Sequence, residues 1–126
     1  MTTLARQAYV DAVVRNYVRL PGTPLRASRQ DSRYARLLYD RSVPLRVVYA
    51  AFVLATARRE IRSASQPRLP PIRTLHFFQG AIAEVLSVGL DPAYVDYLAA
   101  KIKPLVAEKD AALRSSGDRT SNFRVS

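Results

Sequence analysis

The chain has 126 residues, 48% of them hydrophobic and 24% charged, which is typical of one soluble domain with a core and excludes a wholly disordered chain. Its 20 Lys and Arg residues against 10 Asp and Glu give a net charge of +10. The absence of Cys and the presence of a single His exclude a disulfide framework, a thiolate zinc site and a His-rich metal centre.

Hydrophobic periodicity predicts helices along nearly the whole chain. A first helix over residues 3–19 directs Tyr9, Val10, Val13, Tyr17 and Leu20 inward. Pro21 and Pro24 then form a loop. A second helix follows over residues 29–40, with Ser28 as N-cap, Asp31 completing a capping box, and inward-facing Tyr34, Ala35 and Leu38.

A third helix is expected over residues 42–62, with Ser42 as its cap and Pro44 in its first turn. Apolar residues lie on almost every side of it, which is typical of a central core helix. Only a narrow strip is expected to be polar, formed by Arg46, Tyr49, Thr56 and Glu60.

After a Ser- and Pro-rich linker at residues 63–71, a fourth helix is expected over 71–88, with Leu75, Phe78, Ile82, Val85 and Leu86 inward. Asp91 and Pro92 begin a fifth helix, whose expected buried stripe is Tyr94, Val95, Leu98, Ile102, Leu105 and Val106. Pro104 is expected to kink or split this helix. The fold class is therefore all-α: a single bundle of about five helices in residues 1–114, with a flexible tail at 115–126.

The positive charge is unevenly distributed. Residues 1–75 hold 14 Arg against four acidic residues, whereas residues 76–126 are electrically balanced. Such asymmetry is expected when one face meets a polyanion, most commonly nucleic acid. The predicted contact residues on the first two helices and the loop between them are Arg15, Arg19, Arg26, Arg29, Arg33 and Arg36. Tyr39, Arg41 and Arg46, the last of these on the third helix, are expected at the margin of that surface.

Residues 31–55 have the outline of a helix-turn-helix, but the start of the third helix is mostly apolar and offers only Arg46 and Tyr49 to base edges. Base readout by that helix is therefore disfavoured, and phosphate contacts are the predicted mode of binding. A rival interpretation is an adaptor that binds an acidic protein surface within a larger complex. For a protein partner or a homo-oligomer, the C-terminal half offers Arg73, Phe77 and Phe123.

The residues do not indicate an enzyme. His76 has no Ser, Asp or Glu constellation around it, and the four glycines form no phosphate-binding loop. No catalytic residue, metal site or cofactor is predicted. The N-terminus lacks the apolar core of a signal peptide, and no apolar run reaches the length of a membrane span, so a cytoplasmic protein is expected.

The segments DSRYARLLYDRSVPLRVVYAA (31–51) and PIRTLHFF (71–78) resemble the helical accessory domains of DnaD-like replication-initiator and replisome-organiser proteins of mobile elements. The resemblance implies a small factor that binds DNA or bridges proteins, and it favours DNA over RNA. The chain departs from that group because it lacks a separate winged-helix domain and any Trp.

Overall fold

The computed structural model describes residues 3–61, 66–67 and 69–125, with the side chains of 5–114 apart from the same gaps. The described chain contains α1 (Thr3–Arg19), α2 (Arg29–Asp40), α3 (Leu45–Glu60), the 3-10 turn η1 (Leu75–Phe78), α4 (Gln79–Val88) and α5 (Pro92–Val125), and no strand. The predicted all-α fold of about five helices is confirmed.

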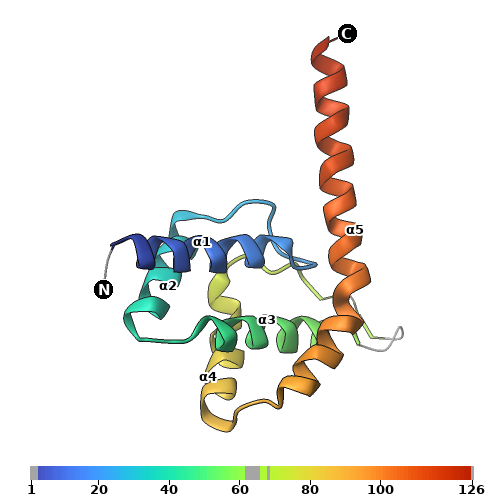
Figure 1. Cartoon of the computed structure of the whole chain (residues 1–126). Coiled ribbons are helices and arrows are strands. Elements are labelled where there is room, and N and C mark those ends of the chain that lie inside the picture. Colours follow the sequence, from blue (N-terminus) through green and yellow to red (C-terminus); the bar gives the residue numbers. More distant parts are fainter. Residues whose placement is uncertain (1–2, 62–65, 68, 126) are drawn as a thin grey trace.

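Helix α3 lies at the centre of the bundle (Figure 1) and packs against α1, α4, α5 and η1. Its apolar residues are buried nearly all round, as the sequence predicted. The prediction that Thr56 belongs to an exposed polar strip was wrong, because Thr56 is buried among these apolar residues. The core residues expected from the first two helices are all buried.

The turn between α2 and α3 differs from the sequence prediction. Ser42 has a φ of 61° and closes α2: its N–H donates to Tyr39 O (2.9 Å), and the Val43 N–H donates to Leu38 O (3.0 Å). This is the Schellman pattern, in which a left-handed residue satisfies the last carbonyls of a helix. Ser42 is therefore part of a C-terminal cap, and Pro44 occupies the N-cap position of α3.

Asp31 is the buried polar group that joins distant parts of the chain. Its carboxylate accepts the Ser28 N–H (2.9 Å) in the predicted capping box and also accepts the Leu75 N–H (2.8 Å). The Ile72 N–H donates to Gly22 O (2.8 Å), which holds the same segment against the first loop. These long-range bonds hold residues 71–74 out of the expected fourth helix, so α4 begins only at Gln79 after the η1 turn.

Helix α5 buries Val95, Leu98 and Ile102 but leaves Tyr94 exposed, and Leu86 of α4 is exposed as well, so both predictions of burial were wrong. The reason is that α3 covers only one stripe of each helix. Helix α5 is not split at Pro104, and its first turns are inclined to its later ones (Figure 1). It continues to Val125, where the sequence predicted a flexible tail from residue 115.

Lys109 fastens α5 to the C-terminal end of α1. Its ammonium donates to Leu20 O (2.6 Å), Thr23 O (2.9 Å) and Thr23 Oγ1 (2.8 Å). Next to it, Asp110 pairs with Arg19 (3.1 Å). Partial burial lowers the pKa of Lys109 below its usual value, so these bonds come at an electrostatic cost.

Replacing Asp31 tests its double role. Asp31→Ala is expected to lower the free energy of unfolding by about 3 kcal/mol, because it removes a helix cap and strands the buried Leu75 N–H. Ser28→Ala removes the other half of the cap and is expected to cost about 1 kcal/mol. Urea unfolding followed by circular dichroism measures both values, and equal losses would contradict the link to η1.

Tyr9 should make the fold sensitive to alkali. Burial raises its pKa to about 12, and Tyr34 nearby adds to the effect. Because the unfolded chain ionises first, the stabilisation is complete below about pH 10 and is lost as pH rises toward the folded-state value. The free energy of unfolding should fall by about 1 kcal/mol more in wild type than in Tyr9→Phe between pH 9 and 11. Tyr97→Phe, which removes an exposed phenol, serves as the control.

Candidate functional site: an arginine-lined groove

One groove brings together arginine side chains from α1 and α2. It has a volume of about 520 Å³ and lies between the start of α1, the outer face of α2 and the η1 turn. Its walls, here called the arginine groove, are formed by Arg6, Gln30, Arg33, Tyr34, Arg36, Leu37, Asp40 and His76. Three guanidinium groups therefore surround a single carboxylate.

Arg6 and Asp40 join α1 to the last turn of α2. The Arg6 guanidinium donates two hydrogen bonds to the Asp40 carboxylate, from Nε (3.2 Å) and from one terminal nitrogen (2.7 Å). Both side chains are partly exposed. Arg33 and Arg36, three residues apart on α2, lie on the same side of that helix. Neither has a carboxylate partner among the described side chains.

Aromatic rings line one end of the groove. The His76 ring lies on the Tyr34 ring, with centroids 4.1 Å apart and planes 32° apart. Tyr34 is buried, and burial raises the pKa of its phenol, whereas His76 is exposed at the surface. The Leu75 N–H bond to Asp31 positions this end, because His76 is the next residue along the chain.

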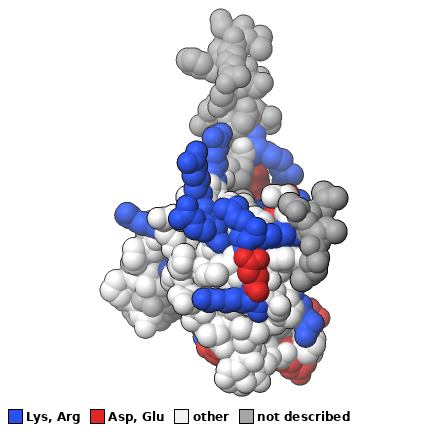
Figure 2. All heavy atoms as spheres, turned by 90° about the vertical axis from the view of Figure 1, so that its left-hand side faces the viewer, with Lys and Arg blue, Asp and Glu red and all other residues white. Residues whose placement is uncertain are grey.

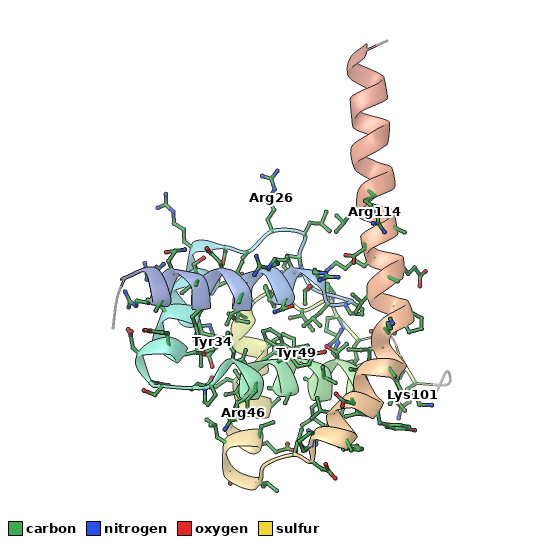
Figure 3. All side chains as sticks on the ribbon, viewed as in Figure 1. Arg26, Tyr34, Arg46, Tyr49, Lys101 and Arg114 are labelled. Atoms are coloured by element: carbon green, nitrogen blue, oxygen red, sulfur yellow. The ribbon has the colours of Figure 1, made fainter. Side chains whose placement is uncertain are left out.

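The face that carries α2 is strongly basic. Figure 2 shows Lys and Arg side chains gathered across its upper middle, with little acidic surface between them. Arg26 lies on the loop before α2 and Arg29 is the first residue of α2, and both are exposed. In Figure 3, Arg26 projects away from the helical body.

The predicted contact residues do not all lie together. Arg33 and Arg36 line the groove. Arg29 is exposed in the first turn of α2, and Arg26 and Arg41 are exposed on the segments that flank it. Arg46 lies on the opposite side of the body from Arg26 (Figure 3) and lines other hollows, beside Tyr49. The structure therefore supports a smaller cluster than the sequence predicted.

Helix geometry explains why the arginines of α1 lie on different sides of the helix. Arg6 and Arg15 are nine residues apart, about two and a half turns, so they point in nearly opposite directions. Only Arg6 meets α2. Arg15 is exposed on the other side, and Arg19 is paired with Asp110 of α5.

Tyr39 was among the predicted contact residues. Its ring instead packs edge-on against Tyr9, with centroids 5.3 Å apart, and it is partly buried at the margin of the core. Tyr39 is therefore a packing residue between α1 and α2.

The residues predicted for a protein partner have different surroundings. Arg73 is exposed, and Phe77 is 46% exposed with the Arg59 guanidinium 5.4 Å from its ring centre. The side chain of Phe123 lies outside the described residues. Arg6 was not predicted as a contact residue, because its place in the groove depends on its pairing with Asp40, which is 34 residues away in the sequence.

No protein-family model, no curated protein and no solved structure matches this chain. Within the described residues, no three His, Asp or Glu side chains come close enough to hold a metal ion. None of the helices described has the length and apolarity needed to cross a membrane.

Proposed function

We propose that this protein is a small, non-catalytic nucleic-acid-binding accessory protein that binds phosphates in the arginine groove. The observation that carries the proposal is the convergence of Arg6, Arg33 and Arg36 on one groove whose only carboxylate is Asp40. Guanidinium groups bind phosphate in a bidentate manner, and several of them on one face supply sequence-independent affinity.

Arg26, on the loop before α2, and Arg29, in the first turn of α2, extend the proposed surface. DNA is the proposed ligand, because residues 31–51 and 71–78 resemble DnaD-like accessory domains. For the same reason, the proposed biological role is in the replication of mobile elements. Phosphate contacts of this kind position a protein on nucleic acid without reading base sequence.

An adaptor that binds another protein is a second candidate. Tyr49 is 47% exposed and lines three neighbouring hollows outside the arginine groove. The walls of these hollows include apolar side chains of Ala50, Phe52 and Val53. A pull-down before and after nuclease treatment separates the two candidates. A partner that survives digestion favours the adaptor, and one that is lost favours nucleic acid.

Removing the two groove arginines of α2 tests the location of the site. Arg33→Gln/Arg36→Gln is expected to weaken binding of a labelled 20-base-pair duplex about tenfold at 50 mM salt. The slope of log Kd against log salt concentration should fall by nearly two, because each arginine removed is expected to lose one phosphate contact. Fluorescence anisotropy measures both quantities.

Arg46→Gln/Lys103→Gln is the matched control, because it removes the same charge from exposed positions that line other hollows. Equal losses in the two double variants would show that net charge, and not the groove, determines affinity. Absence of binding by the wild-type protein at low salt would overturn the proposed function itself.

Asp40 is expected to restrain binding. Asp40→Asn removes the only carboxylate of the groove and frees the Arg6 guanidinium, so the same duplex should bind about threefold to fivefold tighter at 50 mM salt. Stability should change by less than about 1 kcal/mol, because exposed ion pairs contribute little. Asp11→Asn, an exposed acid outside the groove, changes net charge equally and should have a smaller effect.

A further inference from the structure

The first turns of α5 carry an exposed aromatic pair that the arginine groove does not use. Tyr94 is 47% exposed and Tyr97 is 56% exposed, whereas most other Tyr and Phe side chains described are buried or partly buried. The buried stripe of α5 runs beside them through Val95, Leu98 and Ile102. The two rings therefore lie at the edge of the contact with α3, with about half of each side chain exposed.

The two tyrosines are arranged in parallel. Their ring centroids are 6.4 Å apart and their planes differ by only 17°. The spacing of three residues places both on one side of the helix. Both rings are exposed and nearly parallel, so each leaves aromatic surface on which a base can stack.

Cations accompany both rings. Lys101, four residues after Tyr97, holds its ammonium 5.3 Å from the centre of the Tyr97 ring. On the side of Tyr94 lies Arg58, which pairs with Glu84 at 2.7 Å. That hydrogen bond raises the pKa of Arg58, and Tyr94 is close enough to contribute in the same direction. Aromatic faces bordered by cations are the pattern with which proteins bind single-stranded nucleic acid.

The contact between Lys101 and Tyr97 can be exchanged for a base. A cation over an exposed aromatic ring is held more weakly than a nucleobase stacked on that ring. A base that takes the ring face releases the Lys101 ammonium, which then lies within reach of the backbone phosphate. The exchange retains a favourable partner for each group.

Exposed ring faces favour unpaired bases. The faces of a base inside a duplex are covered by its neighbours in the stack, so the base can cover a tyrosine ring only after it leaves that stack. A single strand allows its bases to unstack at a far smaller cost than a duplex does.

We infer that Tyr94 and Tyr97, with Lys101 and Arg58 beside them, form a stacking site for unpaired nucleobases. The inference rests on the proposed nucleic-acid binding and adds a second site, selective for single strands. Phosphate contacts in the arginine groove supply affinity for either form of nucleic acid, and the tyrosines favour the single strand.

The absence of Trp from the chain makes a direct test available. Tyr97→Trp introduces a unique fluorophore, which a stacked base is expected to quench. Addition of a 20-mer of thymidine should quench it strongly, and a 20-base-pair duplex should quench it little. Tyr49→Trp is the matched control, because Tyr49 is as exposed as Tyr94 but lies beside other hollows, and its fluorescence should not change.

Affinity provides a second, independent measurement. Tyr97→Ala is expected to weaken binding of the labelled 20-mer about tenfold and to leave duplex binding unchanged. Tyr97→Phe keeps the ring and should bind as wild type does. Thermal unfolding followed by circular dichroism confirms that each variant is folded.

The outcomes separate the two proposals. If wild type binds both nucleic acids, but Tyr97→Ala binds the single strand equally well and Tyr97→Trp is not quenched, the stacking site is wrong and the arginine groove stands. If wild type binds neither form at low salt, both proposals are wrong. If Tyr97→Ala loses single-strand and duplex binding equally, the tyrosine acts without strand selectivity and the inference is overturned.

Discussion

The buried carboxylate of Asp31 is the interaction on which the rest of the structure depends. It caps α2 through Ser28 and binds the Leu75 N–H, which lies 44 residues further along the chain. A buried carboxylate is costly unless its oxygens accept hydrogen bonds, and here backbone donors satisfy both oxygens. The segment before α4 is therefore held against α2, and His76 comes to rest on Tyr34. The aromatic end of the arginine groove follows from this one contact.

A second connection sets the position of α5. The Lys109 ammonium lies at the end of α1, where it donates to the Leu20 and Thr23 carbonyls, and the pair of Arg19 and Asp110 lies beside it. Apolar contacts of Val95, Leu98 and Ile102 fix the rotation of the helix about its axis. That rotation leaves Tyr94, Tyr97 and Lys101 outside. Hydrophobic packing thus decides which aromatic residues are left for a ligand.

The two proposed contact surfaces differ in the physics of recognition. Guanidinium groups around the groove attract any phosphate backbone, and their effect weakens as salt screens the charges. The paired tyrosines act through the flat faces of their rings, which depend little on salt but require unstacked bases. A protein that combines the two would hold nucleic acid by charge and distinguish strand type by stacking.

The sequence by itself determined the helices of the N-terminal half, the capping box at Ser28 and Asp31, the central position of α3, and the basic character of the region around α2. These features are local, because helical periodicity, caps and prolines act within a few residues. Tertiary structure alone decided that residues 71–74 are not helical, that Tyr94 is exposed, and that Arg6 joins the groove while Arg19 is paired with α5. The pairings behind these outcomes join residues at least 34 positions apart, such as Gly22 with Ile72 or Asp40 with Arg6. Sequence periodicity gives the direction of a side chain relative to its own helix, and only packing determines what that side chain meets.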